Sequence, residues 1–236
     1  MSRAALILAL VAGVTASSTA DAGGKKRAKK KDSRKPTKST KANMPRGFVW
    51  PPNKRMTELG EDCTRTVEEL GVSFKTEKKA GRVVSPMSLP EATIGGITFT
   101  PVYAKHQVWD CQLVLALARF APALTDLGVR EVKYGSAFRW SKVRVNGRTK
   151  NILSRHALGI ALDIVSFVDA DGNEANVEKD YRKGNELLLS IEKAVNASGS
   201  FRLLLTPKND PRSHKDHFHL EANPDYTSPP TERPAS

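Results

Sequence analysis

Residues 154–165 read SRHALGIALDIV, and the second half of this segment is apolar except for one carboxylate, Asp163. We expect a β-strand over residues 160–168, because the apolar run is short and ends at the turn sequence Asp169-Ala-Asp-Gly172. Side chains alternate along a strand, so Asp163 would share one face with the small Ala161. A buried carboxylate without a partner is costly, and Asp163 therefore needs a cation or several hydrogen bonds.

Histidines supply a candidate cation site around Asp163. The chain has five histidines, and four of them lie in the first segment and in SHKDHFHLE, residues 213–221. Gly159 permits a close approach or a sharp turn, which would let His156 fold back over Asp163. Alternatively, the neighbouring Arg155 or Ser154 could satisfy the carboxylate without any metal.

The second segment adds two imidazoles. As a strand, residues 217–221 would place His217, His219 and Glu221 on one face and the intervening Phe218 and Leu220 in the core. One histidine of the pair could bind the metal while the other serves as an outer contact or as a base. Two histidines and one aspartate leave the fourth tetrahedral position of a zinc ion open, which is typical of catalytic rather than structural sites.

The spacing of these residues resembles that of a known group of zinc domains. A pattern S-x-H-x-x-G-x-A-x-D followed by a terminal H-x-H is the signature of the lysostaphin/D-Ala-D-Ala-peptidase/sonic-hedgehog group, and residues 154–163 match it. The resemblance implies a hedgehog/D-Ala-D-Ala-peptidase-like fold. It also implies zinc as the cofactor, held by His156, Asp163 and His219.

The spacing H-x-x-H-x-H at His214, His217 and His219 resembles the murein endopeptidases of that group. This resemblance implies that His217 is the catalytic base and that His214 supports it. D-Ala-D-Ala carboxypeptidases have a glutamate where this chain has Asp216, which would either orient a histidine or be solvated. The stretch Ser136-Ala-Phe-Arg139 resembles S-G-Y-R, which implies that Arg139 binds a substrate carboxylate or stabilises the oxyanion. The alternative for Arg139 is a surface position on a strand.

The chain as a whole resembles the bacterial extensin-like C-terminal domain family over roughly residues 60–222, including an ending similar to H-x-D-H-F-H-L-D. A second cysteine pair, expected from that family near Phe138 and Ala197, is absent. The resemblance implies a zinc peptidase that acts on peptidoglycan peptides or another envelope polymer, as an endopeptidase or a carboxypeptidase. The alternatives are a non-catalytic zinc-containing module that binds the cell envelope, and another metal-dependent hydrolase.

The N-terminal residues have the features of an export signal. Arg3 precedes the apolar run Ala4–Val14, which is too short to span a bilayer, and Ala20-Asp-Ala22 fits a cleavage site. We therefore expect a signal peptide over residues 1–22, a periplasmic or extracellular location, and no transmembrane segment in the mature chain.

The formal net charge of +13 is concentrated in one segment. Residues 23–55 hold 13 Lys and Arg residues and one Asp, whereas residues 56–236 are almost neutral. This composition predicts a basic disordered linker over residues 23–56, serving either as a spacer or as a tether to an anionic surface. Export makes a nucleic acid an unexpected partner. Residues 223–236 contain four prolines and are predicted to form a disordered tail.

The remaining residues, 57–222, predict one α+β domain: a small, mostly antiparallel sheet with flanking helices. Helices are expected over 61–70, from the N-cap Asp110 to 127, and over 181–197. Strands are expected within 72–108 and over 129–138, 201–205 and 217–221, with a hairpin turn at Asn146-Gly147. Cys63 and Cys111 are expected to form a disulfide in an oxidising compartment, and His106 is expected to be structural rather than a ligand.

Overall fold

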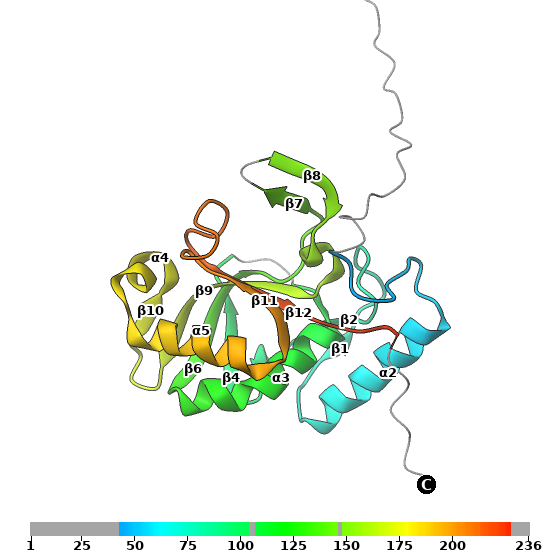
Figure 1. Ribbon diagram of the computed structural model, residues 1–236. Coiled ribbons are helices and arrows are strands. Elements are labelled where there is room, and N and C mark those ends of the chain that lie inside the picture. The colour runs from blue at the N-terminus through cyan, green and yellow to red at the C-terminus, as the bar shows by residue number, and fades with distance from the viewer. Residues whose placement is uncertain (1–42, 104–106, 146–147, 228–236) are drawn as a thin grey trace, which may run out of the picture. The chain divides into compact units, whose positions relative to one another are not determined.

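The computed structural model describes residues 43–103, 107–145 and 148–227, and they form an α+β domain around one central sheet (Figure 1). The sheet consists of β3 (Thr93–Ile94), β4 (Ile97–Pro101), β6 (Val129–Ser136), β9 (Ala161–Asp169), β10 (Glu174–Asn176), β11 (Phe201–Leu205) and β12 (Phe218–Ala222). Its order is β11-β12-β9-β6-β4-β3, with β10 paired to β9. Only the β4–β6 pair among these described strands is parallel. The predicted α+β class with a mostly antiparallel sheet is confirmed.

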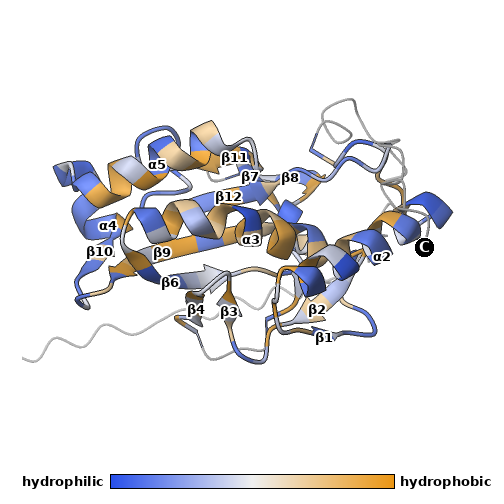
Figure 2. Cartoon of the chain, turned by 90° about the horizontal axis from the view of Figure 1, so that it is seen from below, coloured by the Kyte–Doolittle hydropathy of each residue, from blue (hydrophilic) through white to orange (hydrophobic). Residues whose placement is uncertain are grey.

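The long helices of the described chain are α2 (Lys54–Glu69), α3 (Cys111–Asp126) and α5 (Glu186–Ser198), and its short ones are α4 (Val177–Asp180) and the 3-10 turns η1 (Arg155–Leu158) and η2 (Tyr181–Lys183). Seen from below, α3 and α5 lie in front of the sheet and cover one of its faces, whereas α2 lies beside the sheet and packs against α3 (Figure 2). The core between the helices and the strands is apolar, and Phe120 of α3 packs edge-on against Phe201 of β11 at 5.5 Å between ring centroids.

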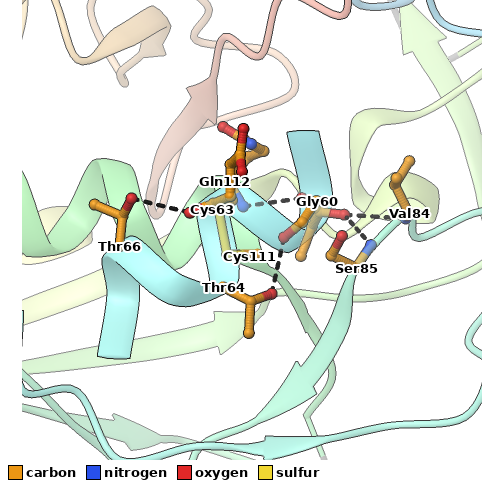
Figure 3. The surroundings of a disulfide bond; sticks show 10 residues. Gly60, Cys63, Thr64, Thr66, Val84, Ser85, Cys111 and Gln112 are labelled. Atoms are coloured by element: carbon orange, nitrogen blue, oxygen red, sulfur yellow. Dashed lines mark hydrogen bonds between the residues drawn. A yellow bond between two sulfur atoms is a disulfide. The ribbon is translucent and has the colours of Figure 1, made fainter. Parts of the chain in front are cut away.

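The start of α3 is fixed by a buried carboxylate and a disulfide. Asp110 accepts a hydrogen bond from the backbone N–H of Gln112, as expected of an N-cap, and two more from the N–H groups of Val84 and Ser85. The disulfide joins the next residue, Cys111, to Cys63 of α2 (Figure 3). The predicted cap and the predicted disulfide are both confirmed.

Two smaller sheets flank the central one. β1 (Lys75–Thr76), β2 (Pro86–Ser88) and β5 (Trp109–Asp110) form a three-stranded sheet, and β7 (Lys142–Val145) pairs with β8 (Arg148–Leu153). The β7–β8 pairing agrees with the predicted hairpin. Its turn, Asn146-Gly147, and the histidine at position 106 lie outside the described residues.

Two helix boundaries differ from the prediction. The third long helix begins at Glu186 rather than at residue 181, because Gly184 takes a left-handed conformation (φ 84°) and Asn185 caps the helix through the Leu188 N–H. The first helix begins at Lys54, seven residues earlier than expected, with Asn53 as its N-cap.

The domain is longer than the predicted 57–222. Residues 43–56, expected to be part of the disordered linker, pack on the domain: Asn43 donates to the Leu153 carbonyl at 2.8 Å, and the Phe48 ring contacts Tyr226. Tyr226 itself is 4% exposed, so the segment 223–227 is not a disordered tail either. The predicted signal peptide and residues 23–42 and 228–236 lie outside the described residues. Within the described part, no helix is both long and apolar enough to cross a membrane.

Candidate metal centre

The adjacent strands β6, β9 and β12 place Ser136, Asp163 and His219 side by side, in one row across the sheet, and this row is the centre of the site. His219 on β12 is the cross-strand partner of Asp163 on β9, and Asp163 pairs on its other side with Ser136 at the end of β6. Phe218, the residue before His219 on β12, points into the core, where its ring contacts Phe167 and Tyr181. The predicted alternation of β12, with polar side chains on one face and apolar ones on the other, therefore holds.

His156 enters the same row from the turn η1, directly before β9. Ser154 caps this turn through the His156 N–H, and Gly159 ends it in a left-handed conformation (φ 68°). A Cβ at position 159 would lie 2.9 Å from the Asp110 backbone nitrogen, which donates to the Gly159 carbonyl at 3.0 Å. Only glycine fits this contact without strain, and the turn carries His156 back over Asp163 as predicted.

Three atoms that could each be a metal ligand lie close together in this row. His156 Nε2 is 3.0 Å from Asp163 Oδ1, His219 Nδ1 is 2.8 Å from the same oxygen, and the two nitrogens are 3.2 Å apart. A tetrahedral ion with bonds of about 2.0–2.2 Å separates its ligand atoms by roughly 3.3–3.6 Å. The observed triangle is slightly tighter than this. All three residues are buried and could together hold a metal ion.

Neighbouring groups fix the protons on both rings. His156 Nδ1 lies 3.1 Å from the Ala137 carbonyl oxygen, which can only accept, so Nε2 presents a lone pair. His219 Nε2 lies 3.1 Å from the Glu221 carboxylate, so Nδ1 of the neutral ring presents a lone pair as well. With Asp163, three lone pairs converge, and a metal ion or a proton must lie among them.

The electrostatics of the site follow from burial and close pairing. Burial lowers the pKa of His156 below its ordinary value. Burial alone would also lower the pKa of His219, but its hydrogen bonds to Asp163 and Glu221 outweigh this and raise that pKa to about 9. Burial would raise the pKa of Asp163, yet the two histidines hold it well below its usual range. In the metal-free site a proton on His219 therefore takes the place of a cation.

Glu221 anchors the outer side of His219. Its Oε2 pairs with Arg155 Nε at 3.3 Å and with Arg202 Nη1, while Arg155 also donates to the Ala222 carbonyl. Burial would raise the pKa of Glu221, but His219 and the two arginines keep it below its ordinary value. Neither Ser154 nor Arg155 bonds to Asp163, contrary to the metal-free alternative. The sequence pattern placed Glu221 on this face but predicted no role for it.

The other two histidines stand beside the candidate ligands. His217 Nε2 is 3.5 Å from Asp163 Oδ1, and its Nδ1 is 2.7 Å from Asp216, which therefore orients a histidine. The His214 ring lies 5.0 Å from those of both His217 and His219, and its Nδ1 is 2.9 Å from Asp210. Burial lowers the pKa of His214 to about 4, so this ring is neutral at physiological pH.

Arg139 forms the wall of an open cleft next to the row. Its Nη1 lies 3.0 Å from Asp163 Oδ2 and 3.3 Å from Ser136 Oγ, and half of its side chain is exposed. The cleft has a volume of about 630 Å³, and Asp163, Arg139 and His217 are among its lining residues. All the residues predicted for the site, His156, Asp163, His219, His217, His214 and Arg139, are thus brought together.

The family model described as "Extensin-like protein C-terminus" matches residues 61–228. The chain belongs to this extensin-like family. The extensin-like span contains the whole candidate metal centre and both cysteines, and α2 begins seven residues before it. No curated protein and no solved structure matches the chain. The likeness to the lysostaphin/D-Ala-D-Ala-peptidase/sonic-hedgehog group therefore stays a prediction.

Proposed function

We propose that this extensin-like protein is an exported, zinc-dependent hydrolase that cuts peptide bonds in peptidoglycan or a related envelope polymer, as an endopeptidase or a carboxypeptidase. One observation carries the proposal: three buried lone pairs, from His156, Asp163 and His219, converge beside an open cleft. A carboxylate and two imidazoles that serve only the fold would not be expected to direct one acceptor atom each toward a shared point.

The donor set suits zinc. Zinc favours four-coordinate sites with imidazole nitrogen and carboxylate oxygen, and three protein ligands leave one position open, as in catalytic sites. When bound, zinc supplies Lewis-acid chemistry: it polarises a carbonyl group and makes water more acidic.

His217 is placed to move a proton. Its Nδ1 donates to Asp216, so its Nε2 carries the lone pair, and that nitrogen lies 3.5 Å from Asp163 Oδ1 in the wall of the cleft. A base that takes a proton from attacking water at this position contributes about 10²–10⁴-fold in rate. The neutral His214 packs against the His217 ring and limits its movement.

Arg139 is placed to bind negative charge. One of its N–H groups pairs with Asp163, and the planar guanidinium has further donors that can face the cleft. These donors can bind a substrate carboxylate or the oxyanion that develops at the attacked carbonyl.

Export is part of the proposal. It is supported by the signal-like residues 1–22 and by the Cys63–Cys111 disulfide, since disulfides persist in oxidising compartments. In this setting the basic residues from 23 onward act either as a spacer or as a tether to the anionic envelope.

The proposal is tested by incubating the purified full chain, with and without zinc, with purified peptidoglycan and identifying released fragments by mass spectrometry. We expect zinc-dependent release of peptide fragments. If the zinc-loaded chain binds peptidoglycan but releases nothing, it is a non-catalytic envelope module and the hydrolase proposal is refuted.

A further inference from the structure

Charge is segregated along the segment that builds the site. Between Glu131 and Asp163 there is no Asp or Glu, but there are seven Lys and Arg residues. Four of the seven lie on the β7–β8 hairpin, which stands clear of the central sheet in Figure 1. Lys142 is hydrogen-bonded to Asn151 across the two strands, whereas Arg144, Arg148 and Lys150 are exposed.

A second basic segment meets the base of this hairpin. A Cβ at Gly81 would lie 2.9 Å from the Phe138 ring and 3.2 Å from Trp140, so the loop around residue 81 lies against the chain that leads into β7. The Arg82 guanidinium lies 6.0 Å from the Trp140 ring centroid. We define the cationic rim as the six exposed residues of the two segments, Lys78, Lys79, Arg82, Arg144, Arg148 and Lys150.

The rim has unused binding capacity. Among the described residues, none of its six cations forms an ion pair with a carboxylate. Trp140, next to Arg82, is 61% exposed and offers an apolar ring. β7 and β8 pair only with each other, so each strand keeps one edge without a strand partner in the described structure, where an extended chain can lie.

The rim is continuous with the candidate metal centre. The hairpin leaves the site at Arg139, which contacts Asp163, and returns to it at Ser154, which caps the turn carrying His156. A strand rises about 3.3 Å per residue, so the six residues of β8 span roughly 20 Å. A polymer held on the hairpin therefore extends well beyond a bond placed at the site.

We infer that the cationic rim and Trp140 bind an acidic peptide segment of the substrate, one with several carboxylates outside the bond that is cut. The inference rests on the proposed hydrolase function and names the substrate class for the same site. Charge complementarity supports it, because several cations without carboxylate partners favour a ligand that carries several anions. An extended peptide also matches the free strand edges.

The test measures binding of fluorescein-labelled tetraglutamate to the full, metal-free chain by anisotropy at low salt. Arg144→Gln/Arg148→Gln/Lys150→Gln removes three rim charges. Lys54→Gln/Arg119→Gln/Lys193→Gln removes three exposed charges from α2, α3 and α5 and keeps the same basic N-terminal segment. Exposed pairs are each worth about a factor of two, so we expect about tenfold weaker binding for the rim variant and less than twofold for the control. Equal losses in both variants would overturn the inference.

Two further arms make the result specific. Labelled tetraglutamine should bind weakly to all three proteins, because it lacks the carboxylates. A single-stranded oligonucleotide with four phosphates serves as another anion, and rim-dependent binding of it that is tighter than that of tetraglutamate would overturn the assignment to an acidic peptide. If the triple variant has a lowered melting temperature, Lys150→Gln alone should still weaken tetraglutamate binding by about twofold.

Because tetraglutamate binding is measured on the metal-free chain, the result tests this inference separately from the proposed hydrolase function. Rim-dependent binding of tetraglutamate supports the inference even if the zinc-loaded chain cuts no peptidoglycan. Zinc-dependent hydrolysis together with rim-independent binding refutes the inference and leaves the proposed function in place. For an active enzyme, the rim variant should raise KM for acidic peptides with kcat unchanged.

Discussion

His219 lies between two carboxylates, with Nδ1 2.8 Å from its cross-strand partner Asp163 and Nε2 3.1 Å from Glu221 two residues later on the same strand. The Glu221 contact fixes which nitrogen carries the proton and turns the other toward the centre. Carboxylates that bind the far nitrogen of a ligand histidine orient the ring and raise its basicity. The proposed metal binding would therefore depend on a residue that does not touch the metal.

The first prediction concerns the metal itself. The wild-type chain should bind one zinc ion, and Asp163→Ala should lose it. The substitution removes the carboxylate ligand, whose oxygen lies next to the ligand nitrogens of both histidines. Elemental analysis of dialysed protein checks this. Asp169→Ala, at the partly exposed end of the same strand, is the matched control and should keep the zinc. Equal zinc content in wild type and Asp163→Ala would show that the assignment is wrong.

The second prediction concerns Glu221. Glu221→Gln should weaken zinc binding by about 10–100-fold, because the amide holds the His219 ring less firmly and faces two arginines. Competition with a chromophoric chelator measures the affinity, and Glu174→Gln on β10 should leave it unchanged. Glu221→Ala should in addition destabilise the fold by about 3–5 kcal/mol, since Arg155 would be left buried without its partner. A wild-type zinc affinity in Glu221→Gln would mean that His219 needs no such anchor.

The third prediction separates metal binding from proton transfer. His217→Ala should keep most of the zinc and the fold while hydrolysis of peptidoglycan peptides falls by about 10²–10⁴-fold. His219→Ala should lose both zinc and activity. If His217→Ala loses zinc as completely as His219→Ala, then His217 is a ligand. Full activity in His217→Ala would move the role of base to another group, with His214 the next candidate.

The fourth prediction is a pH dependence of stability. Burial raises the pKa of Asp110 from 3.8 to about 6, despite three hydrogen bonds from backbone N–H groups. A raised carboxyl pKa means that the unfolded state releases the proton first, so the contribution of this group to stability is present below about pH 4 and is lost as pH rises to about 6.

Asp110→Asn isolates this contribution, because every other titrating group is the same in the wild type and in the variant. The free energy of unfolding of wild type, relative to that of Asp110→Asn, should fall by about 3 kcal/mol between pH 4 and 6 and then stay level. Urea titrations at several pH values measure it. A difference that rises over this interval would show that the backbone donors, rather than burial, control the carboxyl group.

The fifth prediction concerns the disulfide. Cys63 and Cys111 lie 48 positions apart, and closing a loop of this length stabilises the fold by on the order of 4 kcal/mol in the chain-entropy model. Cys63→Ala/Cys111→Ala should show a loss of this size in urea unfolding. A reductant should destabilise the wild type similarly and leave the double variant unaffected. No effect of the reductant on the wild type would mean that the bond does not form in the isolated protein.

The sequence predicted that His156, Asp163 and His219 lie together, because the signals for this grouping are local. Alternation along a strand predicts the direction of Asp163, and Gly159 marks the turn that brings His156 back. The contact of Glu221 with His219 was missed, although alternation along β12 places both residues on one face. The further partner of Glu221, Arg202, could not be predicted, because its strand β11 becomes a neighbour of β12 only through the sheet order. Spacing along one strand contains no information about which strand lies beside it.

The boundary errors have a different physical cause. The prediction of a disordered linker over residues 23–56 rests on the average composition of this basic segment. The average takes no account of Met44 and Phe48, two apolar residues that pack against the core of the domain. The third helix was started too early because its apolar spacing continues across Gly184-Asn185, where glycine permits a left-handed turn and asparagine caps the next helix. In both places one or two residues determine the local structure, although the average composition of the surrounding residues predicts a different one.

The position of β12 in the sheet sets an order of events during biosynthesis. β12 is the last strand of the described chain, yet it lies between β9 and β11 rather than at an edge. Its histidine follows Asp163 by 56 positions, so a chain emerging from the ribosome exposes two candidate ligands well before the third. Such a nascent chain has an incomplete centre, and the proposed hydrolytic activity can begin only after this strand has inserted.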